Sequence, residues 1–361
     1  MAKRRLGRVL TAGVSMLVLG ACATTEVPPP VSAPPPPAAA APAPTPAPAP
    51  APRVAAPAPR PLPEAFESND FVVTFAKAGD TPQGLAARFL GDAGRAWMIE
   101  DYSDTSKLAA GQEVVIPKRP WNPSGVDPSG YQLVPVLAYH NLAPQAKGRM
   151  VMAAKQFEEQ MRYLKAQGYH VMSLRDFSDF TNLKLQVPRR SVVLTFDDGY
   201  RSFLEYASPI LKELGFTATL FLYTDYVGAG RNSLTWEEIK RLEGEGFEVG
   251  GHSKTHDNLR RKAGEADQAY ARRLQAELSQ ALFQRHLGRT MQAIAYPYGA
   301  TDDEVIQKTR ENGYVAAFTV RRQGNPSFTN PFVLNRSQIY PEMSLEDFAK
   351  NLNTFNQETI K

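Results

Sequence analysis

Cysteine is almost missing from this chain of 361 residues, which contains only Cys22. A single cysteine excludes an intrachain disulfide and any metal site built from several thiolates. A long hydrophobic run is missing as well, because the apolar stretch over residues 9–19 is too short for a comfortable membrane span. Positive charges precede that stretch and small residues follow it, a pattern typical of a secretory signal over residues 1–21.

An excess of positive charge is also lacking once the first 21 residues are set aside. The formal net charge of +4 comes from Lys3, Arg4, Arg5 and Arg8, which precede every acidic residue. Residues 22–361 therefore carry no formal net charge, and we expect no nucleic-acid partner. The chain also has no Gly-x-Ser-x-Gly elbow, no Walker loop and no dinucleotide fingerprint, so these catalytic and nucleotide-binding signatures do not explain it.

Cys22 ends the stretch Leu19-Gly-Ala-Cys22, which resembles the cleavage box of bacterial lipoproteins. The resemblance implies a lipid on Cys22 that anchors the protein in a membrane. A simple signal peptide with a chance cysteine is the alternative. Because the next residue is Ala23 and not aspartate, the resemblance also implies the outer membrane. We therefore expect a cell-envelope lipoprotein on the outer membrane, facing the periplasm.

Residues 22–65 are predicted to form a tether. Between Pro28 and Pro63 lie 17 of the 30 prolines, mixed mainly with alanine. Proline fixes φ and removes amide donors, so this tract favours an extended, semi-rigid, polyproline-like chain. Its expected role is to space the folded part of the protein from the membrane.

Residues 66–120 form a small unit with the predicted order β-α-α-β. Phe71–Phe75 alternates like a strand and Glu113–Pro117 closes the unit as a second strand. Helices are expected over residues 83–89 and 95–102.

Three pieces of this unit resemble a LysM module: Gly79-Asp-Thr81, Leu85-Ala86 and Leu108-x-x-Gly111-Gln-x-x-x-Ile116-Pro117. The resemblance implies binding of N-acetylglucosamine chains such as peptidoglycan. An asparagine that is usual in LysM modules is missing near Tyr102. A spacer that has kept only the fold is therefore the alternative.

The stretch Ser191–Tyr200 carries the main chemical signal. Its β-branched and apolar residues predict a buried strand, which ends in Asp197-Asp198-Gly199. Two adjacent carboxylates repel each other, so this pair requires a cation or a shared proton. An Asx turn that caps the following helix is the alternative.

Two of the five histidines, His252 and His256, stand four residues apart after another short apolar strand. Within one helical turn this spacing points both side chains the same way, which suits two nitrogen ligands of one metal ion. Histidines that are merely hydrogen-bonded on a loop are the alternative. One carboxylate would complete a three-ligand site that leaves positions open for water and substrate.

Apolar runs and helical patterns alternate from Tyr131 onward, which predicts a parallel α/β fold, a distorted (β/α) barrel. The expected strands are 133–139, 191–196, 216–223, 247–250, 291–296, 314–320 and 332–334. The expected helices are 156–167, 201–214, 235–243, 266–287, 302–312 and 345–353. In such a barrel, catalytic residues lie on the loops after the strands, where the Asp pair and the histidines fall.

Thr195-Phe-Asp-Asp-Gly-Tyr200 followed by His252-Ser-x-x-His256 resembles the first two motifs of the polysaccharide deacetylases, the NodB-like carbohydrate esterases of family 4. The resemblance covers residues 131–361. It implies a hydrolase in which Asp198, His252 and His256 bind a divalent metal ion and Asp197 is the general base. Zinc is the expected metal, although cobalt, nickel or iron would fit the same ligands.

Ala295-Tyr-Pro-Tyr-Gly299 resembles the third motif of the family and implies an oxyanion site at the backbone N–H of Tyr298. Ala295 stands where the family usually has an arginine. Another residue must therefore orient Asp197, and Arg336 is the candidate. A rigid turn that packs on the barrel rim is the alternative for this loop.

The family commonly uses a late histidine as general acid, but no histidine follows His286 in this chain. Val136-Leu-Ala-Tyr-His140 instead resembles the Tyr-His motif of exopolysaccharide deacetylases that act on poly-β-1,6-N-acetylglucosamine. The resemblance implies that His140 is the acid, whereas a structural histidine at the end of a strand is the alternative.

Two functions remain open from the sequence. The first is metal-dependent removal of N-acetyl groups from a polysaccharide that contains N-acetylglucosamine. The second is a glycan-binding lipoprotein whose hydrolase domain has lost activity, since Ala295 replaces an arginine and the late histidine is missing. Retention of both carboxylates and both histidines favours the enzyme. The LysM-like unit favours peptidoglycan as substrate, while the early Tyr-His motif favours an exopolysaccharide.

Overall fold

The structure is a computed structural model that describes residues 64–358. The predicted signal peptide, Cys22 and almost all of the predicted tether lie outside these residues. The described residues belong to one compact unit. Between residues 64 and 358, no helix combines the length and the apolar character needed to span a bilayer.

The first described residues form the small predicted unit. Its elements are β1 (Ala65–Glu67), β2 (Phe71–Phe75), α1 (Pro82–Leu90), η1 (Ala93–Arg95), α2 (Ala96–Ser103) and β3 (Glu113–Pro117). Thr81 caps α1 by accepting a hydrogen bond from the backbone of Gly84. The apolar side chains of Val72, Leu85 and Ile116 are fully buried between the antiparallel sheet and the helices. The order β-α-α-β is confirmed, with β1 as an additional strand that the sequence did not predict.

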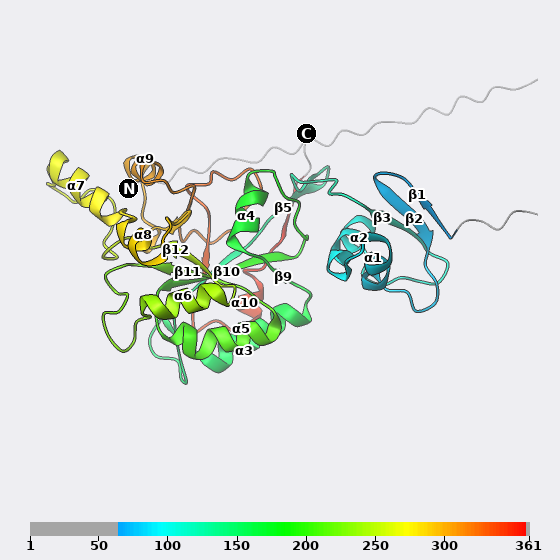
Figure 1. The fold of residues 1–361 in the computed structure, drawn as a ribbon, viewed down its shortest axis with the longest axis horizontal. Helices are drawn as coiled ribbons and strands as arrows, with labels where there is room; N and C mark the ends of the chain where they lie inside the picture. The colour runs from blue at the N-terminus through cyan, green and yellow to red at the C-terminus, as the bar shows by residue number, and fades with distance from the viewer. Residues whose placement is uncertain (1–63, 359–361) are drawn as a thin grey trace, which may run out of the picture. The chain divides into compact units, whose positions relative to one another are not determined.

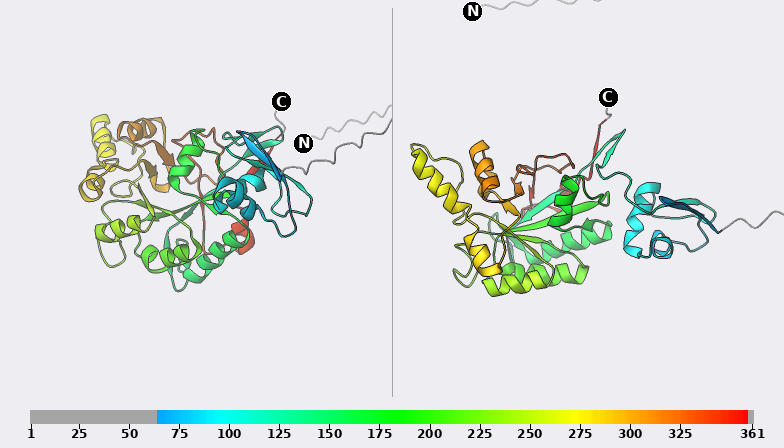
Figure 2. Two further views of the ribbon diagram at one scale, coloured as in Figure 1. Left: turned by 45° about the vertical axis from the view of Figure 1, so that its right-hand side comes forward. Right: turned by 45° about the horizontal axis from the view of Figure 1, so that its top comes forward.

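The larger part of the chain contains a parallel sheet with the strand order β14-β13-β12-β11-β10-β6-β15. These strands are β6 (Val136–Tyr139), β10 (Ser191–Asp198), β11 (Thr219–Leu222), β12 (Glu248–Gly251), β13 (Ala293–Ala295), β14 (Ala316–Phe318) and β15 (Ser337–Gln338). A short strand, β9 (His170–Val171), also pairs with the start of β10. The predicted distorted (β/α) barrel is confirmed, and Figures 1 and 2 show its curled sheet.

One segment of the chain reaches both edges of this sheet. Leu334 forms a parallel bridge to Phe318 of β14, and Ser337 of β15 pairs with β6 three residues later. The sheet therefore curls toward closure through residues 334–338. This segment carries Arg336, so the closure brings a distant part of the sequence to the end of β10.

Helices cover the outer face of the sheet, and Figures 1 and 2 show α3, α5 and α6 along one side of it. The helices are α3 (Ala154–Ala166), α4 (Leu174–Thr181), α5 (Ser208–Leu214), α6 (Trp236–Gly244), α7 (Asp267–Glu277), α8 (Ala281–Leu287), α9 (Asp303–Glu311) and α10 (Leu345–Ala349). A π-helix, η2 (Phe203–Ala207), precedes α5, and a 3-10 turn, η3 (Pro297–Gly299), follows β13.

Both faces of β10 are buried, which explains its almost continuous apolar sequence. Leu194 and Phe196 belong to the core beneath the outer helices, whereas Val193 belongs to a second core inside the curl of the sheet. Phe177 and Phe180 of α4 fill that inner core. Side chains on alternate faces of β10 therefore contribute to the two cores.

Short strands complete the fold. The pairs and small sheets involve β4 (Val126–Asp127), β5 (Gly130–Gln132) and β16 (Phe355–Gln357), together with β7 (Asn141–Ala143) and β8 (Val151–Ala153).

Two predicted elements are wrong. The single helix expected over residues 266–287 is two helices, α7 and α8, because Gln280 makes tertiary contacts at the break. Its amide donates to the carbonyls of Met291 and Asn312 and accepts from the N–H of Met291. The strand expected over residues 332–334 is reduced to the isolated bridge of Leu334.

Candidate metal centre and active site

The candidate site lies where the parallel strands end. Asp197 and Asp198 end β10, His140 directly follows β6, and His252 directly follows β12. Because the carboxyl ends of parallel strands meet at one edge of the sheet, these residues come together. They line a cavity of about 240 Å³ with residues from other loops. Its lining is His140, Met150, Asp197, Asp198, Tyr200, His252, His256, Tyr296, Tyr298, Val320, Arg336 and Gln338.

Asp198, His252 and His256 form a three-donor cluster whose possible ligand atoms lie within 4.8 Å of one another. Oδ1 of Asp198 is 3.6 Å from Nε2 of His252 and 3.5 Å from Nε2 of His256. This oxygen is buried and has no hydrogen-bond partner in the described part of the chain. A buried carboxylate oxygen that faces two imidazoles fits a divalent metal ion, which would satisfy all three donors.

The protein holds His252 in the orientation of a ligand. Its Nδ1 is 2.7 Å from the carbonyl oxygen of Ala295, so the N–H on Nδ1 donates and Nε2 is free to face Asp198. Burial lowers the pKa of His252 to about 4, and burial also lowers the pKa of His256. Both imidazoles are therefore neutral near pH 7, as metal ligands must be.

The loop that carries the histidines is not a helical turn, so this part of the prediction is wrong. Ser253 and His256 adopt left-handed φ angles of 67° and 65°. Asp198 also has a left-handed φ, of 76°. Such angles are rare outside glycine and indicate backbone held by its surroundings. The two imidazoles converge through this irregular loop, and not through the i, i+4 geometry of a helix.

Asp197 is paired with a buried cation. Nη1 and Nη2 of Arg336 donate to its Oδ1 and Oδ2 at 2.6 and 2.9 Å, and the guanidinium is 0% exposed. Arg336 also donates to the carbonyl of Thr319 and the hydroxyl of Thr195. The predicted contact between Arg336 and Asp197 is confirmed. Arg336 thus supplies the positive charge that an arginine at the position of Ala295 would otherwise provide.

The two adjacent carboxylates differ in proton affinity. Burial raises the pKa of Asp197, but Arg336, His252 and His140 outweigh burial and hold this pKa well below its usual range. Burial raises the pKa of Asp198 to about 6. Asp197 is therefore firmly ionised. A bound cation would offset the cost of burying the ionised carboxylate of Asp198.

The other two predicted site residues lie beside this centre. Nε2 of His140 is 3.9 Å from Oδ2 of Asp197, and its side chain is 10% exposed. Tyr298 lies in η3 with a left-handed φ of 60°. Its ring packs edge-on against the ring of His256, with 4.8 Å between the ring centroids. The structure thus brings together all six candidate site residues of the catalytic domain, whose individual roles remain predictions.

Residues 184–317 match the family model described as polysaccharide deacetylase. Over these residues the chain is similar to the polysaccharide deacetylase family. A Bacillus subtilis protein whose name assigns it to the polysaccharide deacetylases is 25% identical, with 60% of this chain and 75% of that protein covered.

A poly-β-1,6-N-acetyl-D-glucosamine N-deacetylase from Staphylococcus epidermidis is 27% identical to the chain. The match covers 56% of this chain and 73% of that deacetylase. Among solved structures, IcaB from Ammonifex degensii superposes with a TM-score of 0.55 at 24% identity. That superposition covers 62% of this chain and 98% of IcaB, and it shows a common fold.

Proposed function

We propose that this protein is a metal-dependent hydrolase that removes N-acetyl groups from a polysaccharide containing N-acetylglucosamine in the bacterial cell envelope. The observation that carries the proposal is the three-donor cluster of Asp198, His252 and His256 beside an ionised Asp197. The family match of residues 184–317 supports the same reaction class.

The chain's own residues divide the proposed reaction among them. A divalent ion, zinc by preference, would supply Lewis acidity and lower the pKa of a water molecule in the site. Asp197 accepts a proton from the attacking water, and Arg336 keeps its carboxylate oriented. The backbone N–H of Tyr298 stabilises the tetrahedral oxyanion, and His140 protonates the departing amine.

Arg336 also bears on the inactive alternative. Loss of the usual arginine at Ala295 is one argument for a glycan-binding protein without activity. Because Arg336 makes a bidentate contact with Asp197, that argument loses its force. The enzyme is therefore the function we favour.

The proposed substrate is an exopolysaccharide of the poly-β-1,6-N-acetylglucosamine type. His140 reaches the site from the end of β6, as the resemblance to exopolysaccharide deacetylases implies, and one relative's name carries this substrate. Peptidoglycan is the competing substrate, because the small unit resembles a LysM module.

We also propose lipid anchorage through Cys22 in the outer membrane.

The ligand set is tested by Asp198→Ala, His252→Ala and His256→Ala. Each variant should fold but bind metal at least about 100-fold more weakly, because a direct ligand matters more than a residue that only holds a ligand. Metal content after dialysis and acetate release from N-acetylglucosamine oligomers are the measurements. Wild-type metal content in the His252→Ala/His256→Ala double variant would refute the assignment.

The proposed role of His140 as general acid is tested by comparing substrates with two different leaving groups. An amine leaves poorly unless it is protonated, whereas the alcohol of an aryl acetate departs without help. His140→Ala should therefore release acetate from N-acetylated oligomers roughly 10²–10⁴-fold more slowly, yet hydrolyse an aryl acetate almost normally. Both assays are run at matched metal occupancy. Unchanged deacetylation of the oligomer would make His140 structural.

A further inference from the structure

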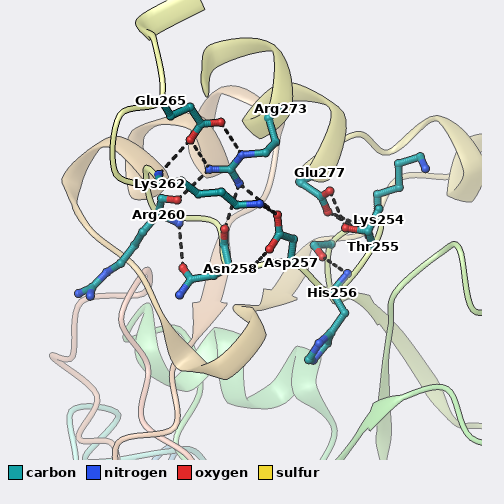
Figure 3. Close-up of polar contacts among 11 residues, drawn as sticks. Lys254, Thr255, His256, Asp257, Asn258, Arg260, Lys262, Glu265, Arg273 and Glu277 are labelled. Atoms are coloured by element: carbon teal, nitrogen blue, oxygen red, sulfur yellow. Dashed lines mark hydrogen bonds and ion pairs between the residues drawn. The ribbon is translucent and has the colours of Figure 1, made fainter. Parts of the chain in front are cut away.

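The loop that carries His256 depends on other elements for its hydrogen bonds. The N–H of His252 donates to Leu222, and the N–H of His256 donates to the hydroxyl of Ser253. The N–H groups of Lys254 and Thr255 instead donate to one side chain at the end of α7, and Figure 3 shows these contacts. The side chain that receives them is Glu277.

Glu277 is the last residue of α7 and is 6% exposed. Its Oε2 accepts from the N–H groups of Lys254 and Thr255 at 3.2 and 2.9 Å, and its Oε1 accepts from the Thr255 hydroxyl at 2.7 Å. Within the described residues no cation lies at ion-pair distance from this carboxylate. The ammonium of Lys254 pairs with Asp225 and not with Glu277. A buried carboxylate without a counter-ion is costly, and here donors of a single loop stabilise it.

We infer that Glu277 is a positioning residue for the proposed metal site. It fixes Thr255, the residue that precedes His256, in a loop whose left-handed backbone is not self-supporting. His252 has independent support, because it directly follows β12 and its ring contacts Ala295. Loss of Glu277 should therefore displace the His256 nitrogen while Asp198 and His252 stay in place.

The inference rests on the proposed metal site but concerns a residue outside it. Ligand atoms must be held within about 0.5 Å of their productive positions, so a loop that loses two backbone hydrogen bonds binds metal poorly. Removal of a residue that only holds a ligand typically lowers metal affinity roughly 10–100-fold. We expect Glu277→Ala to fall in that range.

The experiment titrates purified full-length variants with Co²⁺, whose visible absorption reports the ligands, and competes the bound ion with a chelator. Glu277→Ala should bind Co²⁺ roughly 10–100-fold more weakly and with an altered spectrum, because one imidazole leaves its position. Glu277→Gln should restore most of the affinity and the wild-type spectrum. Its amide oxygen can accept from the backbone and its amide group can donate to the Thr255 hydroxyl.

Asp267→Ala is the matched control. Asp267 lies on the same helix, is exposed and pairs only with Arg261 in the described part of the chain, so this variant should bind Co²⁺ like wild type. If Glu277→Ala does not fold, Glu277→Asp carries the test, because its carboxylate is one methylene too short to reach the loop. Wild-type affinity and spectrum in Glu277→Ala or Glu277→Asp would overturn the positioning role alone. Failure of the wild-type protein to bind Co²⁺ would overturn the metal site and this role together.

Discussion

Asp197→Asn should leave the metal bound and lower acetate release by roughly 10²–10⁴-fold. Asparagine keeps the shape of the side chain but cannot accept the proton that the attacking water gives up. The carboxylate is 2% exposed, touches Arg336 and lies 3.9 Å from His140, so no bulk water replaces it as base. Because the base acts before any leaving group departs, N-acetylated oligomers and an aryl acetate should be affected alike.

The comparison with His140→Ala makes this result specific. The acid variant should discriminate between the two substrates, whereas the base variant should not. Metal content is measured on every sample, so that loss of the ion is not taken for loss of the base. Equal activity of Asp197→Asn and wild type at equal metal content would remove Asp197 from the mechanism.

Arg336→Met should destabilise the fold by about 3–5 kcal/mol, because it leaves the carboxylate of Asp197 buried without its counter-ion. The guanidinium is 0% exposed and donates to the Asp197 carboxylate, to Thr195 and to Thr319, so these acceptors lose a partner at once. The free energy of unfolding, measured with urea, reports this change. Activity should fall as well, because the base loses its orientation.

The double variant Arg336→Met/Asp197→Asn separates charge from packing. With the buried negative charge removed, it should be more stable than Arg336→Met alone. Lys77→Met is a control for the same change at an exposed cation, and it should alter the unfolding free energy little. A double variant no more stable than Arg336→Met would contradict the electrostatic explanation.

Much of the site could be predicted because its parts are local in sequence. Asp197 and Asp198 end an apolar strand, and His252 follows another, so the rule for parallel strands places them together. The apolar runs also locate most strands to within a few residues. Alternation along β2 and β3 predicts both strands of the small unit with the observed bounds.

The parts that could not be predicted depend on tertiary contacts. The break between α7 and α8 follows from the contacts of Gln280, although buried Leu274, Leu278 and Phe283 continue an apolar pattern across it. The left-handed turn at Ser253 is supported by Glu277, a residue 24 positions away in the sequence. The sequence suggests Arg336 only because Ala295 leaves Asp197 without a cation. The contact of Arg336 with Asp197 depends on the closure of the sheet through residues 334–338, which the sequence does not predict.

In the proposed mechanism, acetate release requires one metal ion held by Asp198, His252 and His256. The most direct measurement strips the purified protein of metal, returns zinc in steps, and records bound zinc and acetate release from a β-1,6-linked N-acetylglucosamine oligomer on the same samples. Acetate release should rise in proportion to bound zinc and saturate at about one ion per chain. Undiminished acetate release from the metal-free protein, or no release at full zinc occupancy, would show that the reaction does not depend on this metal site.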